Sequence, residues 1–350
     1  QSPTREDTYL NSYESVTLLE EALANDGLPS QFSAAQIDMY KKSVAGQLSG
    51  IDALLYPNVD WYDHILKGSA PAQRYNVSVR GGTKRMRYYA SGEFYDQKGL
   101  VKNLSNDMYG NSSSPAFRRY AFRANMDLFL TTDLTFSVNF GTRFEERSGG
   151  NFTENELFYE MNHTPGWLFP VSYEIQNGET TKTLYGGNSQ YQNNIAARLA
   201  NAGYYRATNT VNETNFIADY KMDWLTEGLS AKAMVSFDYD SYYKRNFTNT
   251  FATYELLKDE NGNAIDPTVM EGFNRFNADG ELAYSKGNST TYKLYMEAQL
   301  NYARQFGKHD VTGMLLYNQN DYRYNSELAR RYQGLVGRVT YGYDDRYLAE

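Results

Sequence analysis

The sequence of 350 residues contains no cysteine, and this absence removes several classes of chemistry at once. Without a thiol there is no disulfide framework, thiolate zinc site, iron–sulfur cluster or cysteine nucleophile. Basic residues are also in deficit, because 34 Lys and Arg stand against 42 Asp and Glu, which gives a net charge of −8. A chain with this balance has no basic surface of the kind that binds nucleic acid, so we expect no nucleic-acid partner.

Long hydrophobic runs are missing too. No stretch approaches the roughly 20 consecutive apolar residues of a transmembrane helix, and the mean hydropathy is −0.68. The chain opens with Gln1, Ser2 and Pro3 and shows no secretory signal peptide, which indicates a processed chain or a piece of a longer one. Aromatic residues, in contrast, are plentiful at 15%, and together with only 27 Gly and 8 Pro they predict a chain that folds.

Motifs for catalysis or metal binding are absent from the sequence. The three histidines, His64, His163 and His309, are far apart and in no metal-binding or triad spacing. Residues 259–263 resemble a calcium loop, but the glycine stands at position four and Met270 at position twelve, so we favour a hairpin turn. No glycine-rich phosphate loop is present. We therefore expect no catalytic residues, no metal and no cofactor, and a protein that is not an enzyme.

The hydrophobic period divides the chain near residue 70. Residues 6–70 have a helical period, with one helix that Ser12 can cap and Gly27 ends, and a second that begins with the capping-box spacing of Ser33 and Gln36. The rest of the chain alternates with a period of two, which predicts strands and loops.

The clearest strand has a completely apolar face that begins and ends in tyrosine: Tyr292, Leu294, Met296, Ala298, Leu300 and Tyr302. Such a segment is roughly 33 Å long, or about 25 Å high at a tilt near 40°, which is the height of a lipid-facing band between two aromatic girdles. The same pattern predicts nine complete strands, at 73–81, 84–95, 117–129, 134–145, 213–225, 228–240, 289–303, 309–319 and 333–343, and a tenth that begins at Arg346.

A soluble β-sandwich also alternates, so the period alone leaves two fold classes open. Strand length and loop length favour the membrane barrel. Several segments alternate for roughly 11 residues, whereas soluble strands average about 5 to 6. Short turns also alternate strictly with the long loops 96–116, 146–212, 241–288 and 320–332, as in outer-membrane barrels. The fold class predicted is all-β, part of a large antiparallel transmembrane β-barrel.

Several segments resemble the SusC/RagA-type TonB-dependent transporters of Bacteroidota: 56–63 (YPNVDWYD), 73–83 (QRYNVSVRGGT), 87–89 (RYY), 95–100 (YDQKGL), 332–341 (YQGLVGRVTY) and 343–350 (YDDRYLAE). The resemblance implies a 22-stranded barrel in the outer membrane of a Gram-negative bacterium, of which about nine strands are present. It also implies a plug domain and a TonB-contacting segment, and neither is in this chain. Residues 1–70 would then be a helical extracellular loop segment, and residues 71–350 a partial barrel.

For function, the resemblance implies energy-coupled import of glycan or peptide fragments under a SusD-like surface lipoprotein, with TonB acting through the missing N-terminal part and lipid around the barrel. The loop 146–212 is rich in aromatic side chains, which suit stacking on sugar rings or docking of a partner. The candidate substrate- or lid-binding residues are Phe158, Tyr159, Trp167, Tyr185 and Tyr191. Two alternatives stay open: these aromatics can pack the loop's own core, and the chain can be a soluble, secreted carbohydrate-binding or adhesin module.

Overall fold

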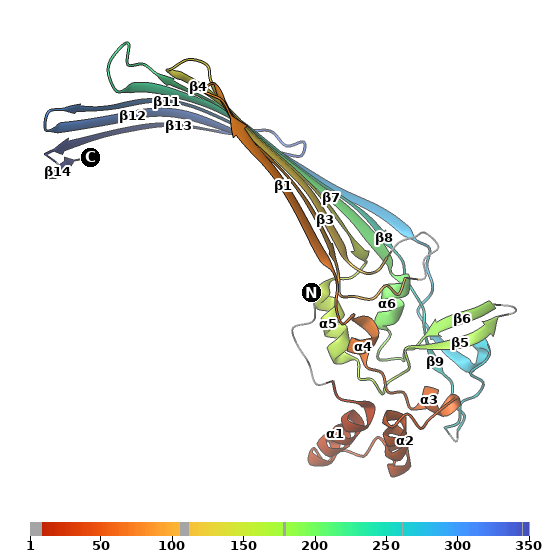
Figure 1. Ribbon diagram of the computed structural model, residues 1–350. Coiled ribbons are helices and arrows are strands. Elements are labelled where there is room, and N and C mark those ends of the chain that lie inside the picture. The colour runs from red at the N-terminus through yellow and green to blue at the C-terminus, as the bar shows by residue number, and fades with distance from the viewer. Residues whose placement is uncertain (1–8, 106–111, 178–179, 261, 345, 350) are drawn as a thin grey trace.

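The computed structural model describes residues 9–105, 112–177, 180–260, 262–344 and 346–349. It consists of one long, curved antiparallel sheet and a lobe of helices and short strands at one end of that sheet (Figure 1). We call this second part the loop lobe. It is built from residues 9–71 and from the two long connections within the sheet.

In the described part of the chain, the large sheet contains ten strands in the order β1-β2-β3-β4-β7-β8-β11-β12-β13-β14, so each strand pairs with its neighbour along the chain apart from the insertions in the loop lobe. The strands are β1 (Ala72–Gly82), β2 (Met86–Lys98), β3 (Ala116–Phe129), β4 (Leu134–Gly150), β7 (Gly203–Lys221), β8 (Leu229–Thr248), β11 (Ala283–Phe306), β12 (His309–Tyr324), β13 (Arg330–Tyr343) and β14 (Tyr347–Ala349). The nine predicted complete strands are present, and the tenth begins one residue after Arg346.

Several strands run further towards the loop lobe than the sequence pattern predicted. β4 continues to Gly150 and β7 begins at Gly203, so the connection predicted as 146–212 is reduced to 151–202; the one predicted as 241–288 becomes 249–282. The connections predicted as 96–116 and 320–332 become 99–115 and 325–329. The reason is that backbone pairing needs no apolar side chains, whereas our sequence criterion required them. At the other end β7 stops at Lys221, and residues 222–225, predicted as strand, belong to the turn before Gly228.

The register places the alternating apolar residues of all the long strands on one face. We call the face that carries Ala298 the outer face, and the opposite one, which carries Gln299, the inner face. Ala298 lies opposite Ala233 on β8 and Tyr317 on β12. The outer face of the other strands carries Val77, Val79, Phe94, Tyr120, Phe122, Ala124, Phe136, Val138, Phe140, Phe216, Ala218, Val235, Phe237, Leu315, Leu335 and Val339. We call this continuous set of residues, together with Leu128, Tyr239 and the apolar face of β11 from Tyr292 to Tyr302, the apolar belt.

The belt is open to the surroundings. Val77, Leu335 and Val339 are 75%, 72% and 68% exposed. The inner face is polar, as expected, and some of its carboxylates form ion pairs: Glu93 contacts Arg74 at 2.6 Å and Arg119 at 2.5 Å. The apolar face of the sheet is therefore uncovered, whereas a soluble sandwich buries such a face against a second sheet.

The belt crosses the hydrogen-bonded rows of the sheet obliquely. The end of the belt nearest the loop lobe is at Leu335 on β13 and at Tyr120 on β3. The residue of β3 that lies in the same hydrogen-bonded row as Leu335 is Leu128, which is eight residues from Tyr120. Eight residues are about 26 Å along a strand, and the six strand-to-strand steps are about 29 Å across the sheet. A level belt thus requires strands tilted by about 40°, which is the tilt of strands in a membrane barrel.

The loop lobe contains the helices α1 (Ser12–Asn25), α2 (Ala34–Val44), α3 (Ile51–Leu55), α4 (Trp61–Ile65), α5 (Glu154–His163) and α6 (Ile195–Asn201), the hairpins β5 (Ser172–Asn177) with β6 (Thr180–Tyr185) and β9 (Thr253–Leu256) with β10 (Phe273–Phe276), and a short 3₁₀ turn, η1 (Met270–Gly272). The two predicted helices are α1 and α2. Ser33 caps α2 with Gln36, as expected, whereas α1 is capped by Asn11 and not by Ser12.

Two hydrophobic clusters hold the loop lobe together. The first joins α4, α5 and α6 through buried residues that include Trp61, Ile65, Met161 and Leu199. The second joins the two hairpins through Tyr173, Leu184 and Tyr254, among others. Segments from the N-terminal part and from both long connections therefore form one packed unit. Among the described residues, no helix is both long enough and apolar enough to cross a bilayer.

Candidate functional site

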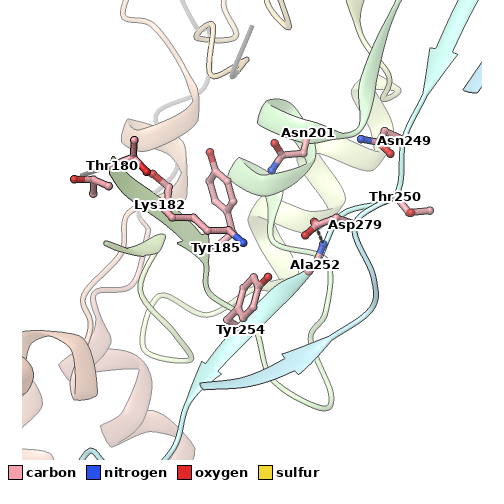
Figure 2. Close-up of a pocket in the computed structure, with 11 residues that line it drawn as sticks. Thr180, Lys182, Tyr185, Asn201, Asn249, Thr250, Ala252, Tyr254 and Asp279 are labelled. Carbon is pink, nitrogen blue, oxygen red and sulfur yellow. Dashed lines mark hydrogen bonds between the residues drawn. The ribbon is translucent and has the colours of Figure 1, made fainter. Parts of the chain in front are cut away.

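A pocket of about 560 Å³ lies in the loop lobe, between the two long connections of the sheet. Figure 2 shows β6 on one side and the segment from residue 249 to β9 on the other, with the end of α6 above them. The lining is mostly polar: Thr180, Thr181, Lys182, Thr183, Tyr185, Asn201, Asn249, Thr250, Ala252, Tyr254 and Asp279. Four separate stretches of chain, 180–185, 201, 249–254 and 279, thus contribute to one cavity.

A buried asparagine fixes the geometry of the first connection. Asn194 donates hydrogen bonds to the carbonyl oxygens of Val171 and Gly186, both at 2.9 Å, and its Oδ1 accepts from the backbone of Ala196 and Ala197 at the start of α6. One fully buried side chain therefore ties the end of β6 to α6. Both N–H groups and the oxygen of the Asn194 amide thus have hydrogen-bond partners, as a buried amide requires.

The second connection is attached to the first beside the pocket. Gly186 forms a parallel bridge with Tyr254, and the amide of Gly187 donates to the Tyr254 carbonyl at 2.9 Å. A side chain at Gly187 would place Cβ 2.7 Å from the Thr253 side chain, so this close approach favours glycine. Backbone contacts therefore join the two connections directly beside the pocket.

The charged groups of the pocket are held in defined positions. One carboxylate oxygen of Asp279 accepts a hydrogen bond from the Ala252 amide at 2.9 Å (Figure 2), and the other pairs with Arg275 at 3.2 Å. Lys182 on β6 supplies a positive charge. The Oδ1 atom of Asn249 is buried and has no hydrogen-bond partner among the described residues, so an acceptor is available there.

The hydroxyl of Tyr254 stays protonated in the pocket and can donate a hydrogen bond. Burial raises the pKa of the Tyr254 hydroxyl, the Asp279 carboxylate raises it further, and Arg275 opposes this. Burial also raises the pKa of the neighbouring Glu255 carboxyl. Rings, hydroxyls and amides that converge in one cavity can bind a polar ligand by stacking and hydrogen bonding. Among the described residues, no cluster of acidic or histidine side chains could hold a metal ion.

The five residues that the sequence singled out do not form one surface. Only Tyr185 lines the pocket. Trp167 packs edge-on against Phe32, with ring centroids 5.1 Å apart, so it helps to attach the N-terminal helices. Phe158 and Tyr159 are 46% and 58% exposed on α5, and Tyr159 stacks on His163 at 3.9 Å. Tyr191 is also exposed, in the connection that precedes α6.

Sequence reasoning missed most of the pocket. Lys182 and Asn201 belong to the loop that was singled out, but they are not aromatic, and Tyr254 and Asp279 lie in the other long loop. No local motif connects these residues, because the contact between Gly186 and Tyr254 that brings them together spans almost 70 residues.

The fold and the pocket define a class of protein: a segment of a large outer-membrane-type barrel wall with an elaborated set of loops at one end. No family model matches the sequence. Two curated proteins of Formosa agariphila are similar to it: TonB-dependent receptor P26, at 26% identity over 97% of this chain and 33% of the receptor, and TonB-dependent receptor P3, at 21% identity over 83% of this chain and 28% of the receptor. The chain thus spans about a third of the length of the curated relatives it matches.

Solved structures agree on the fold. The RagAB peptide transporter matches 97% of this chain and 38% of its own with a TM-score of 0.55 and 14% identity. A second structure, the RagAB peptide importer in a closed-closed state, matches with a TM-score of 0.52 and 13% identity. These matches agree with the resemblance found in the sequence: the chain is similar to TonB-dependent receptors, and its fold is that of part of the β-barrel in the RagAB structures.

Proposed function

We propose that this chain forms part of the wall and outward-facing loops of an outer-membrane importer, which takes up glycan or peptide fragments with a SusD-like lipoprotein and receives energy through TonB. The observation that carries the proposal is the apolar belt, which is continuous across the sheet, exposed, and about 25 Å high at the tilt that its slope gives. A secreted soluble module with this face would expose to water far more contiguous apolar surface than soluble monomers do.

The loop lobe then lies outside the cell, because long loops of such barrels are extracellular and short turns periplasmic. This agrees with the expectation that residues 1–70 are an extracellular segment and residues 71–350 a partial barrel. We propose that the pocket between β6 and β9 contacts the substrate, and that the exposed side chains Phe158, Tyr159 and Tyr191 contact substrate or lid. In support, the RagAB structures are described as a peptide transporter.

The experiment is uptake of fluorescent oligosaccharides and peptides by cells that make the full-length protein. We expect uptake of either oligosaccharides or peptides, and we expect this uptake to be lost when TonB or the SusD-like lipoprotein is deleted. Uptake that persists without TonB would contradict the importer.

A second measurement tests the pocket separately. Lys182→Ala and Tyr185→Ala should reduce uptake at low substrate concentration, whereas Lys41→Ala, exposed on α2, serves as the control outside the pocket. Equal uptake by all three variants and the wild type would exclude the pocket as a capture site and leave the importer itself intact.

A further inference from the structure

The outer face carries a row of three basic side chains beyond the end of the apolar belt. Arg206 on β7 lies opposite Arg245 on β8, and Arg245 lies opposite Lys286 on β11. All three are exposed. Side chains directly opposite each other on antiparallel strands are about 5 Å apart, so like charges there repel and destabilise the pairing. We call these three residues the basic row.

The basic row differs from the other outer-face arginines near the belt. Arg118 pairs with Asp96 at 2.9 Å, and Arg331 pairs with Asp321 at 2.8 Å. Within the described part of the chain, in contrast, no carboxylate forms an ion pair with Arg245 or Lys286. The charge of these two residues is therefore available to an anion from outside the chain.

Acidic groups are sparse around the basic row on this face. Glu146 on β4 lies opposite Thr208, which is one outer-face position closer to the belt than Arg206. Arg206 lies opposite Ser148 on β4, and Thr208 lies opposite Tyr243 on β8. Both of these partners are neutral. One carboxylate thus stands beside three cations, and the patch stays positive.

Aromatic rings border the basic row on the side of the loop lobe. Tyr204, Phe247 and Tyr284 form the next outer-face row, with ring centroids 4.6 Å and 5.2 Å apart. The hydroxyl of Tyr284 also meets that of Tyr243, from the opposite side of the row, at 3.3 Å. Cations between tyrosine hydroxyls and an aromatic surface suit a ligand that combines an anionic group with a sugar ring.

The height of the row identifies the source of such a ligand. Arg245 is six residues beyond Tyr239, the last aromatic of the belt on β8, which is about 20 Å along the strand and about 15 Å in height at a tilt near 40°. The headgroup layer of a phospholipid bilayer extends only about 5 to 8 Å beyond the hydrocarbon. A phospholipid phosphate therefore lies below the row, whereas the sugars of a large glycolipid reach it.

We propose that Arg206, Arg245 and Lys286 bind the phosphorylated core sugars of lipopolysaccharide in the outer leaflet. This inference rests on the proposed location in the outer membrane. The bound phosphate relieves the repulsion within the row and attaches the wall strands β7, β8 and β11, which lead into the loop lobe, to the surrounding lipid.

The test uses the full-length protein purified from the outer membrane and lipopolysaccharide without O-antigen, added to the delipidated protein. The variant is Arg245→Gln combined with Lys286→Gln. The matched control is Lys244→Gln, because Lys244 is the chain neighbour of Arg245 but lies on the inner face, 4.8 Å from the Tyr205 ring. We expect the dissociation constant to rise about tenfold in the double variant and to be unchanged in the control.

Three further measurements complete the test. Arg245→Lys combined with Lys286→Arg keeps both charges and should bind as the wild type does, and dephosphorylated lipopolysaccharide should bind about as weakly as the double variant. Equal binding of lipopolysaccharide by the double variant and the wild type would overturn the inference, as would its displacement by an equal concentration of inorganic phosphate. A wild-type protein that is absent from the outer-membrane fraction would refute the proposed function itself.

Discussion

An arginine in the middle of the apolar belt should prevent stable insertion of the barrel. Ala124 on β3 is four residues from both Tyr120 and Leu128, which mark the ends of the belt on that strand, and it lies opposite Ala90 and Phe140 on the outer face. No charged residue stands opposite it to neutralise a guanidinium. On a lipid-facing surface near the bilayer midplane, arginine costs about 2–4 kcal/mol. We therefore expect Ala124→Arg to lower the free energy of unfolding by that amount.

The neighbouring residue provides the control. Asn125 lies on the inner face, opposite Tyr89 and Asn139, where polar side chains are the rule. Asn125→Arg should change stability by less than about 1 kcal/mol. The assay is urea unfolding of the full-length protein in liposomes, combined with the gel mobility shift on boiling of folded barrels. Equal tolerance of arginine at the two positions would refute the assignment of the outer face to lipid. Ala298→Arg and Gln299→Arg repeat the comparison on β11.

Three predictions concern the loop lobe. Asn194→Ala should lower the free energy of unfolding by about 2–4 kcal/mol, because it leaves four backbone groups without their hydrogen-bond partner. Asn194→Asp should recover only the hydrogen bonds that cap α6. Hydrogen exchange in α6 measures both effects, and unchanged exchange would contradict this role of the side chain. Gly166→Ala would place Cβ 2.1 Å from the Val59 carbonyl oxygen, so we expect faster proteolysis of the connection before α4. Proteolysis as slow as that of the wild type would show that the backbone adjusts. Burial and Lys102 lower the pKa of His64 and outweigh the Asp63 carboxylate, so the folded lobe favours neutral His64. Its contribution to stability is complete above the ordinary pKa of about 6.5 and is lost as the pH falls below it. The protection factors of the α4 amides, which correct for the intrinsic pH dependence of exchange, should therefore fall at low pH, and His64→Gln should abolish that change.

The barrel wall could be predicted from the sequence because its determinants are local. Alternation of apolar and polar residues fixes the face of each strand, and short turns between neighbours fix the order, so Ala124 and Ala298 could be assigned to one face without coordinates. The prediction was wrong where the apolar pattern stops before the strand does, and at residues 222–225, which continue the pattern but form a turn. Beyond Tyr239, for example, β8 continues to Thr248, and the next outer-face residues, Ser241, Tyr243 and Arg245, break the apolar pattern.

The loop lobe could not be predicted in the same way. Its short hairpins pair residues such as Tyr254 and Arg275 across loops, and the pocket depends on the contact between Gly186 and Tyr254 from different connections. Propensity and period carry no information on such long-range contacts. Trp167 illustrates the limit, because aromatic content alone does not distinguish a binding residue from one that packs against Phe32.

The single apolar face also restricts how such a chain can change length. Deletion of one residue within a wall strand would turn every later side chain of that strand to the other face, so that Lys232 would meet lipid and Ala233 the interior. Deletion of two residues would restore the faces and shift the belt by one step along the strand. The wall can therefore gain or lose residues only in pairs, whereas the connections in the loop lobe can vary by any number. Differences in length between related chains should follow this rule of parity, and it gives engineers a simple guide to which insertions the barrel will accept.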